Sequence, residues 1–193
     1  MDHPTPREQL LALAELATRC ADQISDDVAL LAALTQDTLE KGGKLLFCGN
    51  GGSAADAQHL ATEYVVRFRR ERAPLSAVAL TTDTSLLTAA GNDYGFQHVF
   101  ARQVLALGRP GDLLFLHSTS GESENLLLAA DAAREAGVVT VALLAKGGGR
   151  LKGRVDHALV LPTSEGARAQ ELQLAIGHVI CDHVEAHFAK VHP

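Results

Sequence analysis

Residues 44–63 read Lys-Leu-Leu-Phe-Cys-Gly-Asn-Gly-Gly-Ser-Ala-Ala-Asp-Ala-Gln-His-Leu-Ala-Thr-Glu, and this stretch decides the fold. The apolar segment at 44–48 predicts a buried strand, and three glycines within four positions follow it. Small residues from Ser53 onward predict a helix. A glycine turn lets the backbone approach a ligand closely, and a helix N-terminus attracts an anion. The stretch therefore predicts a strand, an anion-binding turn and a helix in succession.

Length and composition indicate the class of protein. The chain has 193 residues, 47% of them hydrophobic, which suits one globular domain with a substantial core. A formal net charge of -6 disfavours nucleic acid and acidic membrane surfaces as partners, because both attract basic proteins. No apolar run reaches membrane-spanning length, and residues 1–4 do not resemble a secretory signal. Cys20, Cys48 and Cys181 are far apart and indicate no disulfide framework, so we expect a cytoplasmic protein.

Strands and helices are expected to alternate along the chain. Apolar runs predict strands at 44–48, 77–80, 112–117, 138–144 and 156–161. Helices are expected between them, including one at 53–68, one that Asp83 caps and that ends before a turn at 91–95, and a closing helix at 167–189. This order predicts an α/β fold, a three-layer sandwich with a central five-stranded parallel sheet between helices. Ligands of such sheets bind outside the carboxyl ends of the strands.

The N-terminal segment, residues 1–42, is expected to be helical and to carry two apolar stripes. One stripe lies within 10–21 and the other within 28–39, and residues 25–27 suggest a break with a new N-cap between them. Two exposed apolar stripes are a liability on a monomer. We therefore expect these N-terminal helices to serve in oligomerisation, and residues 1–193 to form a single domain.

A second polar turn follows the strand expected at 112–117. Residues 118–123 read Ser-Thr-Ser-Gly-Glu-Ser and place four hydroxyls beside a helix start. Hydroxyls and helix N–H groups together bind phosphate without a lysine, whereas an ordinary helix cap needs only one hydroxyl. The turn therefore predicts a phosphate site, provided that the Glu122 carboxylate points away from the anion.

The first glycine turn has an alternative interpretation. Residues 49–54 match the dinucleotide-binding pattern Gly-x-Gly-x-x-Ala. That fingerprint also requires an acidic residue about 20 positions further on, and the first candidate after the second strand, Asp83, comes late. The pattern alone therefore gives weak support for a nicotinamide cofactor.

Titratable residues on two helices are candidates for chemistry. His59 and Glu63 are four residues apart and share a helical face, which suits metal ligands, a catalytic pair or a solvated surface. Gln170 and His178 on the closing helix are eight residues apart, a rise of about 12 Å. They suit one ion only if long side chains converge or if different subunits supply them.

Two further histidines of the closing helix repeat the four-residue spacing. His183 and His187 lie among Asp182, Glu185 and Lys190. Because charged residues surround them, a solvated helix face is favoured over a second metal site.

Taken in order, these motifs resemble the sugar isomerase (SIS) domain family, and within it the bacterial phosphoheptose isomerases. The resemblance covers nearly the whole chain and includes the helix that carries His59 and Glu63. Its other motifs lie at 48–53, 80–84, 91–95, 108–112, 118–121 and 170–171. The resemblance implies an aldose–ketose isomerase that interconverts D-sedoheptulose 7-phosphate and D-glycero-D-manno-heptose 7-phosphate through an enediol.

The resemblance also implies roles for individual residues. Glu63 and His178 would be the acid/base pair. One zinc ion per subunit would be held by His59, Glu63, Gln170 and His178. The substrate would contact Asn50, Gly51, Gly52, Glu63, Asn92, Asp93, Ser118, Thr119, Ser120, Ser123 and Gln170. Members of the family form homotetramers with sites at subunit interfaces, which would fit the wide spacing on the closing helix.

Some features depart from the family pattern and leave a second function open. The family usually has Asn where Glu122 stands, often His at Gln173, and in some enzymes Asp at Ala167. The alternative is a non-catalytic SIS module that binds a replication initiator protein or senses a sugar phosphate. Because both Glu63 and His178 are present, the enzyme is the favoured interpretation.

Overall fold

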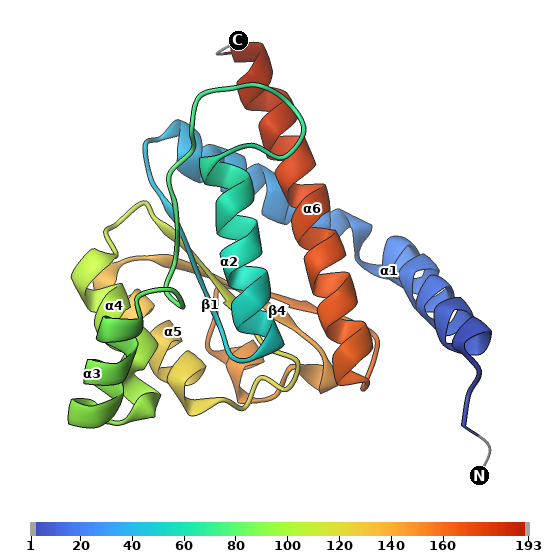
Figure 1. Cartoon of the computed structure of the whole chain (residues 1–193). Coiled ribbons are helices and arrows are strands. Elements are labelled where there is room, and N and C mark those ends of the chain that lie inside the picture. The colour runs from blue at the N-terminus through green and yellow to red at the C-terminus, as the bar shows by residue number, and fades with distance from the viewer. Residues whose placement is uncertain (1–2, 192–193) are drawn as a thin grey trace.

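The chain folds around a five-stranded parallel sheet with helices on both faces (Figure 1). This computed structural model describes residues 3–191, so both ends of the expected 1–193 domain, including Met1 and Asp2, lie outside the described residues. The strands are β1 Leu45–Gly49, β2 Ala77–Ala79, β3 Leu113–His117, β4 Val139–Leu144 and β5 His157–Val160. The α-helices are α1 Pro6–Glu40, α2 Gly52–Val65, α3 Thr84–Tyr94, α4 Val99–Leu107, α5 Glu124–Ala136 and α6 Gly166–Val191. Short 3-10 turns lie at Phe96–His98, Lys146–Gly148 and Arg150–Gly153.

Two apolar layers enclose the sheet, as the sequence predicted. Successive residues of a strand point to opposite faces, so Phe47 packs among residues of α1, α2 and α6 while Leu46 packs among residues of α4 and α5. All five residues of β1 are buried, and so are all five of β3. Burial of each large apolar side chain stabilises the fold by about 1.5–3 kcal/mol. The three-layer sandwich is therefore confirmed.

The strand order places a switch point beside β1. The sheet runs β2-β1-β3-β4-β5, so the chain leaves β1 toward one edge and β3 toward the other. Ligands of open α/β sheets bind at such a point, outside the carboxyl ends of the strands. Gly49 and His117, the last residues of β1 and β3, pair in register. The two polar turns therefore begin at the same level of the sheet.

Three predicted boundaries are wrong. Helix α1 is one continuous helix without a break at 25–27, because Ile24 and Val28 both lie on the face that packs against the core. Helix α3 runs through the expected turn at 91–95 and ends only at Gly95, whose φ of 86° suits glycine. Helix α2 ends at Val65 rather than at 68.

Two further observations concern the class of protein. Among the helices that the structure describes, none combines the length and the apolar character needed to cross a lipid bilayer. Cys20, Cys48 and Cys181 are free and buried, and burial raises the pKa of the Cys181 thiol to about 12. These thiols therefore stay protonated and unreactive at neutral pH.

A buried imidazole ends the central strand. His117 is fully buried, and neither ring nitrogen has a hydrogen-bond partner among the described residues. Burial lowers its pKa to about 4. Gln173 of α6, also fully buried, donates from Nε2 to the carbonyl oxygens of Leu143 at 2.7 Å and Ser118 at 3.3 Å. The sheet end under α6 is thus unusually polar for a core.

We expect His117→Leu to weaken the acid sensitivity of the fold. An unfolded histidine takes up a proton below about pH 6.5, whereas the folded imidazole stays neutral down to about pH 4. The unfolded state therefore binds more protons, and the stability of the wild type falls as the pH drops through this window. Between pH 7 and pH 5 the free energy of unfolding, measured in urea, should fall by about 2 kcal/mol less in the variant than in the wild type.

The control is His3→Leu, which removes an exposed imidazole and keeps the buried one. It should follow the pH dependence of the wild type. Parallel curves for His117→Leu and wild type would contradict the assignment of a buried neutral His117.

Candidate active site and metal centre

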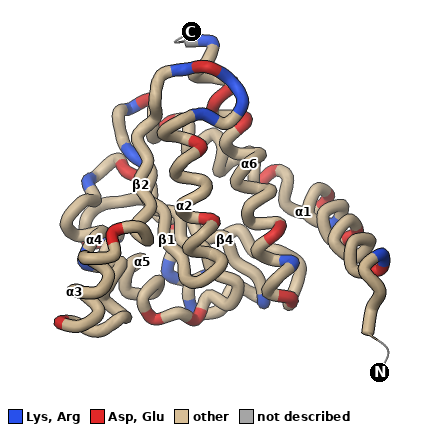
Figure 2. Tube along the Cα trace, viewed as in Figure 1, with Lys and Arg blue, Asp and Glu red and all other residues tan. Residues whose placement is uncertain are grey.

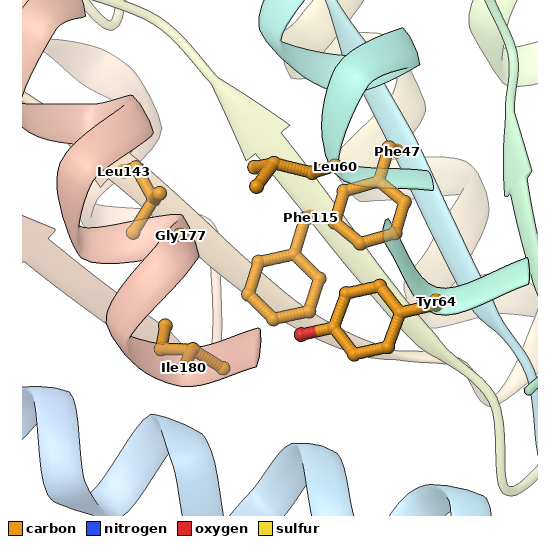
Figure 3. A pocket seen from close by; sticks show the side chains of 7 residues that line it. All are labelled: Phe47, Leu60, Tyr64, Phe115, Leu143, Gly177 and Ile180. Carbon is orange, nitrogen blue, oxygen red and sulfur yellow. The ribbon is translucent and has the colours of Figure 1, made fainter. Parts of the chain in front are cut away.

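Helices α2 and α6 run side by side on one face of the sheet (Figure 1). Their contact includes Gly177 of α6, where an added Cβ would lie 2.6 Å from Leu60 Cδ2. Figure 3 shows the two residues at a small apolar cavity whose other lining residues are Phe47, Tyr64, Phe115, Leu143 and Ile180. The missing side chain at Gly177 therefore lets the two helices approach closely next to His59 and His178.

The close approach brings three potential ligands together. His59 Nε2 lies 2.9 Å from His178 Nε2 and 3.1 Å from Glu63 Oε1. Ligand atoms of all three residues lie within 4.8 Å of one another. The expected i, i+4 pair and the late imidazole thus form one cluster within a single chain.

The cluster fits a divalent metal ion. Zinc binds nitrogen and oxygen ligands at about 2.1 Å, which places tetrahedral ligands about 3.4 Å apart. The measured separations of 2.9 and 3.1 Å are close to that value. Burial, and then the neighbouring His59, lower the pKa of His178. A lowered pKa favours the neutral imidazole, which is the form that binds metals.

Gln170 stands at the other end of the α2–α6 contact. Its side chain rests on Gly52, where an added Cβ would lie 2.7 Å from Gln170 Nε2. His59 follows Gly52 by seven residues, a rise of about 10 Å along α2. Gln170 therefore lies beside the glycine turn, and the other three proposed metal ligands meet further along the helices.

The two polar turns are joined by side-chain hydrogen bonds. Asn50 and Asn125 exchange two of them, at 2.9 and 2.8 Å, between the end of β1 and the start of α5. Ser118 Oγ accepts from the N–H of Gly121 at 3.0 Å, and Ser120 Oγ accepts from the N–H of Glu122 at 3.3 Å. These contacts give the turn at 118–123 a defined shape at the N-terminus of α5.

The remaining candidate residues fall into two groups. Gly51 and Ser123 are the N-caps of α2 and α5, and Thr119 is half-buried between β3 and α5. Asn92 and Asp93 are exposed on α3 and are hydrogen-bonded to each other at 2.8 Å. Asp93 lines a groove between α3 and α4 that contains no other candidate residue. The described chain therefore does not bring Asn92 and Asp93 to the cluster.

A buried carboxylate of α6 was missed by the sequence analysis, which placed Glu185 on a solvated face. It is 1% exposed and accepts hydrogen bonds from the N–H groups of Phe68 and Arg69 at 2.7 Å and Arg70 at 2.8 Å. Buried Arg72 lies 3.7 Å away and donates to the carbonyl oxygen of Glu63 at 2.7 Å. Glu185 therefore holds the loop after α2 against α6.

The fastened loop reaches the cluster through an aromatic ring. Phe68 stacks on the imidazole of His178, with ring centroids 5.1 Å apart and an interplanar angle of 22°. The guanidinium of Arg69 lies 4.8 Å from the centre of the Phe68 ring. Figure 2 shows the basic and acidic residues gathered on this loop, which lies beside the C-terminal half of α6. Glu185 thus positions the Phe68 ring against the imidazole of His178.

We expect Glu185→Ala to destabilise the protein and free this loop. The substitution leaves three N–H groups without their acceptor and Arg72 without its charge partner, so the free energy of unfolding should fall by roughly 3–5 kcal/mol. Hydrogen exchange at the amides of 68–70 should accelerate. Asp182→Ala is the control, since it removes only partly exposed ion pairs with Arg70 and Arg69, each worth about 1 kcal/mol or less. Unchanged amide exchange in Glu185→Ala would contradict the role of the carboxylate.

Comparison with known proteins identifies the relatives of this chain. The sequence model of the SIS domain family matches residues 10–145. The phosphoheptose isomerase of Akkermansia muciniphila is 48% identical over 93% of this chain and 94% of its own length.

Solved structures give the same family. A phosphoheptose isomerase from Neisseria gonorrhoeae superposes with a TM-score of 0.87 at 41% identity, over 94% of this chain and 100% of the other. One from Francisella tularensis superposes with a TM-score of 0.90 at 37% identity, over 93% of this chain and 96% of the other.

Proposed function

This chain belongs to the SIS domain family and, within it, to the phosphoheptose isomerases, and we propose that it interconverts D-sedoheptulose 7-phosphate and D-glycero-D-manno-heptose 7-phosphate. The observation that carries the proposal is the cluster of Glu63 and His178, whose side-chain atoms lie within 4.8 Å of each other. Aldose–ketose isomerisation needs a base at carbon and an acid at oxygen, and these two side chains supply both.

In the proposed mechanism Glu63 removes the proton from the carbon next to the carbonyl group and returns it to the neighbouring carbon. His178 moves the protons of the two oxygens, so that an enediol links aldose and ketose. The Glu63 side chain is only 17% exposed, and this partial exclusion of water strengthens its interactions with a developing charge. The stacked Phe68 keeps water from one face of His178.

The phosphate is proposed to lie in the turn at 118–123, at the start of α5. Backbone N–H groups and hydroxyls of Ser118, Thr119, Ser120 and Ser123 would hold it. Along α2, the glycine turn and His59 are separated by a rise of about 10 Å. An extended chain of seven carbons with bonds of about 1.5 Å spans about 7.5 Å, and the phosphate group at its end lengthens it further. The sugar would run from the phosphate in the turn at 118–123 to the cluster of His59, Glu63 and His178. On the way it would pass Asn50, Gly51, Gly52 and Gln170.

We propose zinc as the metal of the cluster, held by His59, Glu63 and His178. The family resemblance implies Gln170 as a fourth ligand, but in the described chain Gln170 lies beside Gly52, so the fourth position of the cluster is open within one subunit. When bound, zinc supplies Lewis-acid polarisation of the sugar oxygens. Three clustered protein ligands with an open position are typical of catalytic zinc sites.

Zinc should stabilise the folded protein. After chelator treatment, addition of zinc at 100 times its dissociation constant should raise the free energy of unfolding by about 2.7 kcal/mol. His59→Ala should abolish the accompanying rise in melting temperature. His183→Ala, which removes a histidine of the other i, i+4 pair, should keep it. Equal rises in both variants would contradict the assigned ligands.

Glu63→Gln should fold normally and lose about 10²–10⁴-fold in kcat, which is the usual contribution of a positioned acid or base. The measurement is conversion of sedoheptulose 7-phosphate to the aldose by purified protein. The matched control is Glu71→Gln, an exposed carboxylate in the following loop, which should keep wild-type turnover. Turnover near wild type in Glu63→Gln would refute the role of the carboxylate.

Homotetramer formation is proposed from an apolar groove between α1 and α6. Its lining includes Ile24, Val28, Ile176 and the exposed Val179. A second copy covering this groove would bury both helices. The family resemblance implies sites at subunit interfaces, where Asn92 and Asp93 of a neighbouring subunit would contribute. Light scattering that reports a monomer would contradict this assembly.

Two further assignments complete the proposal. We take residues 1–193 as one SIS domain, because α1 and α6 pack in the same layer although the family match ends at 145. The unpaired cysteines support a cytoplasmic location, since disulfides are rare there. The non-catalytic SIS module is disfavoured, because the chain is 48% identical to a phosphoheptose isomerase and carries both Glu63 and His178.

A further inference from the structure

Glu122, within the turn proposed to bind phosphate, is held by one arginine. Arg150 Nε donates to Glu122 Oε2 at 2.8 Å, and the backbone N–H of Arg150 donates to Glu122 Oε1 at 3.0 Å. The second terminal nitrogen of Arg150 donates to the carbonyl oxygen of Glu122 at 3.1 Å and to Glu124 Oε2 at 3.2 Å. A single guanidinium thus pairs with two carboxylates at the start of α5 and offsets one of their two negative charges.

Glycines allow the turn at 118–123 and the loop at 147–151 to approach each other closely at this point. An added Cβ at Gly121 would lie 1.9 Å from the carbonyl oxygen of Gly148, and one at Gly149 would lie 2.3 Å from that of Ser120. Gly121 and Gly149 have φ of 68° and 55°, which side chains rarely adopt. The N–H of Leu151 donates to the carbonyl oxygen of Gly121 at 3.0 Å. The backbone therefore sets Arg150 beside Glu122 independently of the ion pair.

The ion pair contributes little to the stability of the fold. The side chains of Glu122 and Arg150 are 52% and 51% exposed, and exposed pairs are worth about 1 kcal/mol or less. Its effect on a ligand is larger, because a phosphate monoester carries a charge of about -1.5 to -2 at neutral pH. Hydrogen bonds from Arg150 hold the pKa of Glu122 below its usual value, so the carboxylate stays charged when substrate binds.

We propose that Arg150 is a positioning residue for the phosphosugar: it turns the Glu122 carboxylate toward the loop at 147–151 and cancels its charge, so that the turn at 118–123 accepts a phosphate. This inference rests on the proposed function and adds a residue that sets the affinity of its phosphate site. Arg150 acts mainly through Glu122, so the removal of Glu122 should abolish most of the effect of losing Arg150, and only the part that depends on Glu124 should persist.

The test compares Arg150→Gln, Glu122→Gln and the double variant in steady-state assays with sedoheptulose 7-phosphate. Arg150→Gln should raise KM about three- to tenfold with kcat nearly unchanged, because it leaves an unpaired carboxylate near the anion. High salt should reduce that rise by screening the repulsion. Glu122→Gln should leave KM unchanged or lower it. The double variant should return KM to near the value of Glu122→Gln, with any remaining rise due to the unpaired Glu124.

A purely structural cross-link gives a different pattern. If the ion pair only joined the two loops, Arg150→Gln and Glu122→Gln would break the same contact, and both would raise KM. That result, or an unchanged KM in Arg150→Gln, would overturn the proposal. The control Arg134→Gln removes an exposed ion pair with Asp131 on α5 and should not change KM.

Ser120→Ala separates this proposal from the proposed function. A raised KM in Ser120→Ala together with an unchanged KM in Arg150→Gln would keep the phosphate in the turn and reject the role of Arg150. An unchanged KM in both variants would reject the phosphate position itself, and the role of Arg150 with it.

Discussion

The close contact between α2 and α6 is the constraint on which the site depends. Gly177 has no side chain, and Leu60 occupies the space where one would lie. His59 precedes Leu60, and His178 follows Gly177. The same contact that packs the helices therefore also sets the Nε2 atoms of the two imidazoles 2.9 Å apart. The apolar packing between the helices therefore determines the geometry of the polar cluster.

Around that contact, the loops are held by polar groups that the sheet itself does not supply. Asn50 and Asn125 join the two turns at the carboxyl ends of β1 and β3. Glu185 fastens the loop after α2, and through Phe68 it reaches His178. The sheet fixes where the turns begin, and these side chains fix the conformation of the turns and of the loop after α2.

Most of the fold follows from local patterns, while part of the site does not. Apolar runs and glycines predict all five strands, because both features act within a few residues. The break expected at 25–27 was wrong because burial of Ile24 and Val28 against the core outweighs the capping tendency of Ser25. The turn expected at 91–95 was wrong because Gly91 tolerates a helix and only Gly95 needs a positive φ. Glu185 has charged neighbours in sequence, and its burial arises only from a loop more than 110 residues away.

The position of His178 in the chain has a consequence for biosynthesis. Two members of the cluster, His59 and Glu63, are translated before four of the five strands exist, whereas the third arrives with α6, after every strand. A growing polypeptide on the ribosome therefore carries two of the three cluster residues, and a sheet face that α1 and α2 cover only in part, until its last helix docks. A chain that ends before α6 lacks His178 and therefore cannot assemble the cluster.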